Sequence, residues 1–158
     1  MKPEHHYSVD VAWLGNRGSG TSHYREYGRQ NVIAAAGKPV IEASADRTFH
    51  GDADRWNPEE LLVAALSECH MLSFLHVAVV HGVVVTAYTD AAEGVMLQEG
   101  DGGRFTSVTL HPRVTVAGPL DEERFERMHR EAGEKCFIAN SVNFPVRHEG
   151  VLVVEPAI

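Results

Sequence analysis

The chain has 158 residues, 44% of them hydrophobic, so we predict a single domain spanning residues 1–158 with a substantial core. The net charge of -8 argues against binding to nucleic acid or to an anionic membrane. The N-terminus has no apolar signal segment, so we expect a cytoplasmic location, in which thiols stay reduced. Having only two cysteines argues against a disulfide framework, and no His or Cys spacing indicates a metal site.

The first 55 residues have the pattern of short strands joined by loops. Alternating apolar residues predict a strand at 8–13, and the glycine-rich sequence at 15–21 predicts a hairpin turn. One or two return strands are expected within 22–35 and a short extended segment at 38–43. Residues 46–55 are polar and are expected to form an irregular loop.

Residues 56–81 predict one long central helix. Asn57 is suited to cap its first amide groups, Pro58 fits the first helical position, and Glu59 faces the positive end of the helix dipole. His81 and Gly82 mark the expected end of the helix. Apolar residues cover nearly all sides, so we expect protein to surround this helix.

Three polar residues interrupt the apolar run and argue against a membrane span: Glu68, His70 and His76.

The second half predicts further strands and one amphipathic helix. A strand is expected at 83–88, a turn at 98–104, and a long sheet segment at 106–116 with a bend, a bulge or an edge position at Pro112. The last residues, 145–154, predict a strand or a hairpin.

Asp121 is positioned to cap the second helix, which is amphipathic. Its apolar stripe consists of Phe125, Met128, Ala132 and Cys136.

This order of elements predicts an α+β fold with a mostly antiparallel sheet, because the strands come in hairpins rather than alternating with helices. One small sheet covers only one side of the central helix. We therefore predict a homodimer in which the central helices of two subunits pack together between two sheets.

Cys69 and Cys136 each lie on a helix face that is expected to be buried, which leaves two interpretations. Both cysteines are packing residues, or they form a redox pair. In a redox pair, one thiolate attacks the O–O bond of a peroxide and becomes a sulfenic acid, which condenses with the second thiol to give a disulfide. Burial alone would raise the pKa of the attacking thiol, so activation requires a cation, for which arginine is best suited.

The sequence NPEELLVAALSECH resembles the signature of the OsmC/Ohr family, the osmotically inducible protein C and organic hydroperoxide resistance proteins. The cysteine in EKCFIANS and the RGSGT turn also occupy places typical of the family. The resemblance implies an OsmC-like fold, thiol-dependent reduction of organic hydroperoxides at the interfaces of an intertwined homodimer, and no metal, flavin or other cofactor. Phe137 after Cys136, and Glu68 and His70 around Cys69, depart from the usual pattern and indicate a divergent branch.

By this resemblance, Cys69 is the peroxidatic and Cys136 the resolving cysteine, while Glu59 orients the activating arginine, which is matched by Arg17. The plainer interpretation of Arg17 is a solvent-exposed charge in a turn. The plainer interpretation of Glu59 is a carboxylate that interacts with the positive end of the helix dipole. The other candidate arginines are Arg25, Arg29 and Arg55. Glu59 lies roughly 15 Å from Cys69 along a straight helix and about 80° around it. Either the arginine bridges this gap or the partner subunit supplies Glu59 and Arg17, and we favour the partner.

The sequence therefore predicts a cysteine-based peroxidase that acts on organic hydroperoxides and is reduced by a lipoyl-type or thioredoxin-like dithiol. The competing hypothesis is a non-enzymatic dimer that binds an apolar ligand at the subunit interface, with both cysteines structural. His70 is either a helpful cation or a core histidine, and Glu68 opposes thiolate formation unless it points away or pairs with His70. Met71, Phe74 and Phe137 are candidates for an apolar substrate wall.

Overall fold

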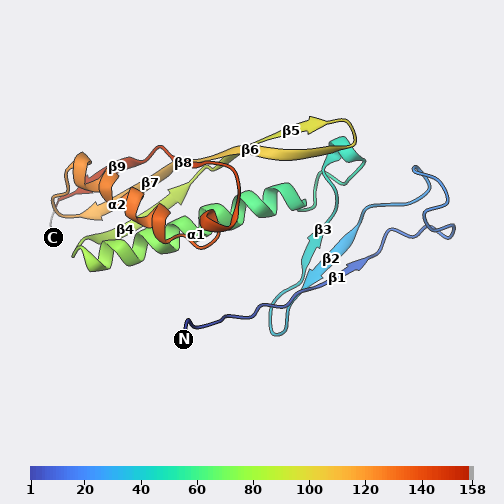
Figure 1. The fold of residues 1–158 in the computed structure, drawn as a ribbon, viewed down its shortest axis with the longest axis horizontal. Helices are drawn as coiled ribbons and strands as arrows, with labels where there is room; N and C mark the ends of the chain where they lie inside the picture. Colours follow the sequence, from blue (N-terminus) through green and yellow to red (C-terminus); the bar gives the residue numbers. More distant parts are fainter. Residues whose placement is uncertain (157–158) are drawn as a thin grey trace. The chain divides into compact units, whose positions relative to one another are not determined.

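The computed structural model describes residues 1–156 (Figure 1). These residues form two compact units, Met1–Leu61 and the chain from Leu62 onward, and each unit is considered by itself. The prediction of a single domain over residues 1–158 is not tested by this division.

The first unit contains a three-stranded antiparallel sheet in the order β1-β2-β3. Its elements are β1 (Asp10–Trp13), β2 (Asn31–Ala34), β3 (Ile41–Ala43) and the short 3-10 helix η1 (Arg47–Phe49).

The predicted hairpin is present, because β1 and β2 pair antiparallel, but its connection is longer than the turn predicted at 15–21: it runs from residue 14 to residue 30 and contains no strand. Its two ends are joined by Trp13 Nε1, which donates to the carbonyl of Gly28 at 2.8 Å. Within the connection, the Arg29 guanidinium lies 4.6 Å and 4.1 Å from the ring centroids of Tyr24 and Tyr27. These contacts hold the segment as a folded loop, so only 31–34 returns as a strand.

Helix α1 (Pro58–Val80) confirms the predicted central helix. Asn57 Oδ1 accepts a hydrogen bond from the amide of Glu60 at 2.8 Å, which is the predicted cap. At the other end Gly82 has φ of 66°, a left-handed conformation that glycine adopts without steric cost.

The second unit contains two three-stranded sheets, in the orders β4-β7-β9 and β5-β6-β8. The first consists of β4 (Val84–Asp90), β7 (Pro112–Ala117) and β9 (Val151–Glu155), and the second of β5 (Glu93–Glu99), β6 (Gly102–Leu110) and β8 (Val146–His148). The pairs β4/β7 and β5/β6 are antiparallel, whereas β6/β8 and β7/β9 are parallel. The remaining elements are α2 (Glu122–Lys135) and the 3-10 helix η2 (Ala139–Ser141).

The α+β class is confirmed, with sheets that are mixed rather than uniformly antiparallel. Strand β5 was not predicted, because every residue of it is exposed and no burial pattern marks it. Residues 145–154 form two strands that pair in different sheets, so the alternative of a hairpin is wrong. The predicted bend at Pro112 is confirmed, since β7 begins there after β6 has ended.

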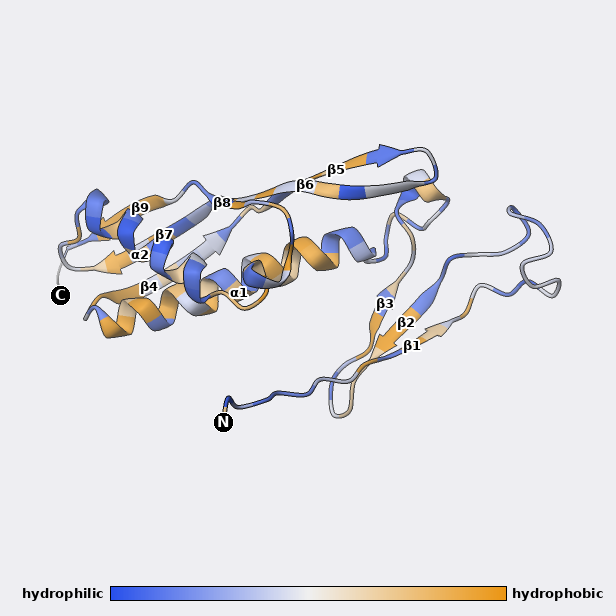
Figure 2. Cartoon of the chain, viewed as in Figure 1, coloured by the Kyte–Doolittle hydropathy of each residue, from blue (hydrophilic) through white to orange (hydrophobic). Residues whose placement is uncertain are grey.

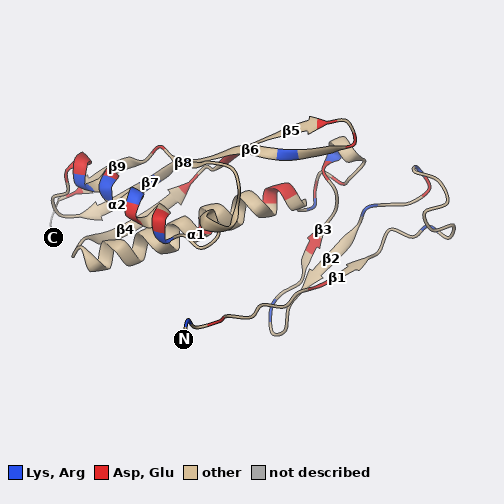
Figure 3. Cartoon of the chain, viewed as in Figure 1, with Lys and Arg blue, Asp and Glu red and all other residues tan. Residues whose placement is uncertain are grey.

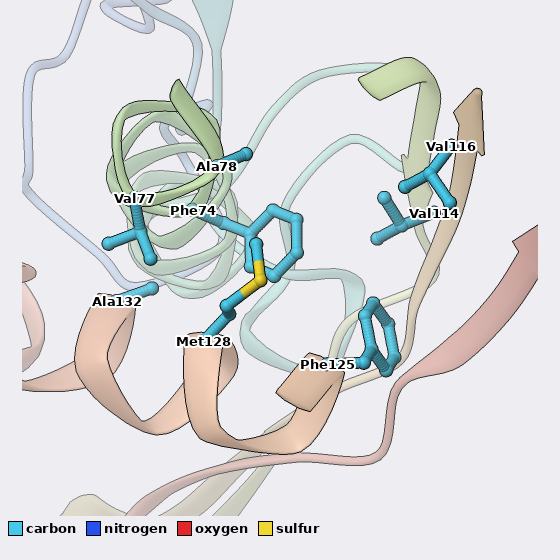
Figure 4. Close-up of a cluster of buried hydrophobic side chains, with 8 residues drawn as sticks. All are labelled: Phe74, Val77, Ala78, Val114, Val116, Phe125, Met128 and Ala132. Atoms are coloured by element: carbon cyan, nitrogen blue, oxygen red, sulfur yellow. The ribbon is translucent and has the colours of Figure 1, made fainter. Parts of the chain in front are cut away.

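The main core of the second unit lies between α1, α2 and β7 (Figure 4). Figure 4 shows side chains from these three elements converging: Phe74, Val77, Ala78, Val114, Val116, Phe125, Met128 and Ala132. The predicted apolar stripe of α2 is confirmed, because all four of its members have 0% exposure. A second, smaller cluster contains Leu66, Val108 and Leu110.

Helix α1 is covered on one face only. Leu72, Val79 and Val80 remain 56%, 77% and 63% exposed, although the helix is apolar along most of its length (Figure 2). Its length and mean hydropathy of 1.6 would suffice for a membrane span, a test that core helices of soluble proteins also pass. Only 28% of that apolar window is buried, which is less cover than the sequence led us to expect.

Candidate active site

The structure brings the two predicted cysteines together. Cys69 lies in the middle of α1 and is half-buried, while Cys136 forms the C-cap of α2 and is fully buried. The two residues approach to 3.0 Å, and both are free thiols. Since the sequence separates them by a helix and four strands, their approach depends on how α2 packs against α1.

Cys136 is held firmly where α2 ends. Its amide donates to the carbonyl of Gly133 at 3.3 Å, and its Sγ accepts a hydrogen bond from the amide of Ala139 at 3.4 Å. Burial, followed by a hydrogen bond with Cys69, raises the pKa of the Cys136 thiol to about 11. Cys136 is therefore protonated at neutral pH and is able to donate its S–H to the sulfur of Cys69.

Cys69 opens onto a pocket of about 800 Å³ in the second unit. The apolar part of its lining consists of Ala65, Leu72, Phe137 and Ile138. Phe137 is thus in the predicted apolar wall, with 78% of its surface exposed. The assignment of Phe74 to that wall is wrong, because its ring is completely buried in the core on the other side of α1.

Two basic side chains that the sequence analysis did not select, Lys135 and His76, also line this pocket. Lys135 Nζ lies 2.5 Å from Glu131 Oε1, so its charge is already paired. Their spacing from the cysteines could have predicted that both residues lie near the site. Lys135 directly precedes Cys136, and His76 follows Cys69 by seven residues, which is about two helical turns.

The residues beside Cys69 take different positions. His70 is 3% exposed, and its Nε2 lies 2.9 Å from Nδ1 of His129. Burial, followed by the nearby charge of His148, lowers the pKa of His70 to about 4, so His70 is a neutral core histidine and not a cation for the thiol. Glu68 is exposed and lines the pocket, and it does not pair with His70.

The predicted arginine and glutamate belong to the first unit. Arg17 is exposed in the long β1–β2 connection, and no described residue hydrogen-bonds its guanidinium. Arg29, one of the alternatives, already donates to the carbonyls of Tyr27 and Tyr24. Glu59 lies in the first turn of α1, and its Oε2 is buried without a hydrogen-bond partner among residues 1–156. The roles of Arg17 and Glu59 stay predictions.

Within residues 1–156, no group of three or more His, Cys, Asp or Glu side chains is arranged to hold a metal ion. The candidate site consists of two thiols and an adjoining pocket. A helix that begins with N-P-E-E-L and carries the more exposed thiol also matches a known sequence profile, that of the OsmC-like proteins, over residues 51–149. The chain belongs to the OsmC-like protein family. The matched region includes Glu59, Cys69 and Cys136, whereas Arg17 lies outside it.

Solved structures of the OsmC-like fold agree with this assignment. An OsmC-like protein of unknown function from Vibrio cholerae is 34% identical, with a TM-score of 0.84 over 94% of this chain and 100% of that chain. An organic hydroperoxide resistance protein from Elizabethkingia anophelis is 18% identical, with a TM-score of 0.69 over 98% of this chain and 100% of that one. A third, an organic hydroperoxide resistance protein OsmC from Legionella pneumophila, is 19% identical, with a TM-score of 0.68 over 95% and 99% of the two chains.

At these lower identities the last two proteins share the fold alone with this chain. A comparison with curated proteins found no match.

Proposed function

We propose that this OsmC-like protein is a cytoplasmic thiol peroxidase that reduces organic hydroperoxides through Cys69 and Cys136. The observation that carries the proposal is the 3.0 Å approach of two unequal thiols, one opening onto a pocket and the other buried with a raised pKa. A thiol that meets a peroxide first must be accessible, and one that reacts second must be close. The family's organic hydroperoxide resistance members agree with this chemistry.

The reaction has two steps on the protein. The Cys69 thiolate attacks one peroxide oxygen, the O–O bond breaks, and the products are a Cys69 sulfenic acid and an alkoxide that takes up a proton to become the alcohol. The Cys136 sulfur then attacks the Cys69 sulfur, the S–O bond breaks, and water leaves as the disulfide forms. An external dithiol, of the lipoyl or thioredoxin-like kind, returns both cysteines to thiols.

The lining of the pocket favours the binding of an apolar peroxide over that of hydrogen peroxide. Its wall near Cys69 includes Leu72, Phe137 and Ile138, which offer no hydrogen-bonding groups from their side chains to a small polar molecule. An alkyl or aryl group bound there would place its peroxide at Cys69. The same wall keeps a second candidate open, a non-enzymatic protein that binds an apolar ligand and uses its cysteines only for packing.

We further propose that the active protein is a homodimer. The exposed apolar face of α1, with Val79 and Val80 as its most exposed members, is the kind of surface that a second copy covers. In this arrangement the partner subunit supplies Arg17 to activate the Cys69 thiolate and Glu59 to orient the arginine. Arg17 suits this role because no described residue occupies its guanidinium.

The test is a titration of thiols after one equivalent of cumene hydroperoxide is added to the reduced protein. We expect rapid loss of both thiols, while Cys69→Ser does not react and Cys136→Ser yields a sulfenic acid that dimedone traps on Cys69. Arg17→Ala should slow the first step by orders of magnitude. If the native thiols survive, or if Cys69→Ser reacts as fast as the native protein, the peroxidase is ruled out and the ligand-binding candidate takes its place.

A further inference from the structure

Three histidines from separate elements meet beside the cysteine pair: His70 of α1, His129 of α2 and His148 of β8. His70 and His129 are hydrogen-bonded at 2.9 Å, with ring planes only 6° apart. The ring centroid of His148 lies 5.2 Å from that of His129. The proposed peroxide chemistry makes no direct use of any of these rings.

The His70–His129 pair is electrically neutral at physiological pH. Burial is the main cause that lowers the pKa of His70 to about 4 and that of His129 to about 3. The charges around the pair are those of Asp90 on β4 and His148 on β8, and His148 Nε2 in turn lies 3.3 Å from Glu126 Oε2. Two neutral imidazoles form one N–H···N bond, in which one ring donates and the other accepts.

The pair lies next to the cysteines on both helices. His70 directly follows Cys69 on α1, and His129 precedes Cys136 by seven residues on α2. Seven residues are nearly two full helical turns, so His129 and Cys136 share one face of α2, about 10 Å apart along its axis. The helices therefore meet at two points on one face of α2, an imidazole contact and a thiol contact.

The ring of His129 has no room to move. It lies 4.2 Å from the ring of Phe74 at 25° and 4.5 Å from the ring of Phe125 at 88°. From the other side the backbone approaches so closely that a Cβ on Gly150 would lie 3.1 Å from His129 Nε2. Because this ring is closely packed, its hydrogen bond to His70 links α1 and α2 at that level.

We propose that the His70–His129 hydrogen bond is a positioning device that keeps the Cys136 sulfur within reach of Cys69 and thereby sets the rate at which their disulfide forms. The inference rests on the proposed function for its biological meaning, although the geometry applies to any oxidant. The two cysteines approach to 3.0 Å, and a disulfide requires their sulfurs to come within about 2.05 Å of each other. If the helices separate even slightly, a smaller fraction of molecules reaches that distance.

The test compares variants that break the hydrogen bond with variants that keep it. His129→Leu removes the bond, whereas His129→Asn retains a polar group near the position of Nδ1. His70→Leu and His70→Gln form the same contrast from α1, in case one position does not tolerate leucine. Met128→Ala is the matched control, because it weakens the packing of α2 in the same core and leaves both imidazoles in place.

Two oxidants separate this inference from the proposed function. Cumene hydroperoxide reports sulfenic acid formation at Cys69 and then disulfide formation, with dimedone trapping the sulfenic acid that has not been resolved. Diamide reports disulfide formation alone: one thiolate adds across its N=N bond, and the second thiolate displaces the reduced hydrazine as the S–S bond forms. If the native protein forms the disulfide with diamide but does not react with cumene hydroperoxide, that result overturns the proposed function and leaves this inference standing.

With either oxidant we expect His129→Leu and His70→Leu to slow disulfide formation at least tenfold. With cumene hydroperoxide, the rate of sulfenic acid formation at Cys69 should stay within twofold of native. His129→Asn and His70→Gln should recover most of the rate, and Met128→Ala should remain near the native rate. Native rates in both leucine variants overturn the inference, as does a Met128→Ala rate as low as theirs, because general helix packing would then account for the effect.

Discussion

The two faces of α1 are made of similar residues and lie in opposite environments. His70, Phe74 and Val77 on the inner face are at most 3% exposed, while Leu72 and Val79 on the outer face are 56% and 77% exposed. Charged residues on α1 beyond its first turn are few, in contrast to α2 (Figure 3). Hydrophobicity alone therefore does not tell which face of the helix is buried, and an exposed apolar face of this kind often marks an interaction surface.

The largest effect is expected on the inner face. Phe74→Ala removes a completely buried ring that contacts Phe125 and His129, and should lower the free energy of unfolding by about 3–5 kcal/mol. Urea denaturation followed by circular dichroism measures this change. The control is Leu97→Ala on β5, which is 49% exposed and should change stability by no more than about 0.5 kcal/mol. An equal loss in the free energy of unfolding for the two variants would contradict the assignment of the inner face to the core.

On the outer face, Val79→Asp should act on association rather than on the fold. In the proposed dimer two copies of α1 meet at this face, and a carboxylate introduced there would be desolvated. We therefore expect the dissociation constant of the dimer to rise at least about a hundredfold, equivalent to about 2.7 kcal/mol. Sedimentation velocity over a concentration series measures it. Val95→Asp, at a similarly exposed position on β5, is the control and should keep the native oligomer. A native chain that sediments as a monomer at micromolar concentration would rule out the dimer.

A pH dependence of stability also belongs to the inner face. Because the pKa values of His70 and His129 are about 4 and about 3 in the folded chain, against 6.5 for a free histidine, the unfolded chain binds more protons between these values. The contribution of the two neutral histidines to the free energy of unfolding should therefore be fully present above pH 6.5. It should fall as the pH drops toward 4, by about 1.4 kcal/mol per pH unit for each histidine.

Denaturation curves between pH 4 and pH 7.5 test this slope. It should become shallower in His129→Asn, which removes one of the two buried imidazoles. His76→Gln, on the exposed face of α1, should keep the native slope. A slope that is identical in all three proteins would place the acid sensitivity in other groups.

Local patterns in the sequence were sufficient to predict the helices and the central strands. The Asn57 cap, the apolar run of α1 and the stripe of α2 all depend on residues close together in the chain, and the structure has them as predicted. Strand β5 was not predicted because its residues are all exposed and show no alternation of buried and exposed positions. The pairing of β8 and β9 in different sheets was not predictable either, because it depends on partner strands far away in the sequence.

By itself, the sequence determined the family of this protein, its two helices, and the fact that each helix carries one cysteine on an apolar stretch. Only the tertiary structure decided that these cysteines approach to 3.0 Å, that Cys69 opens onto a pocket, and that Cys136 is buried with a raised pKa. The physical reason is that burial and contact are properties of pairs of elements. The bond between His70 and His129 joins residues 59 positions apart, and no local pattern records that they meet.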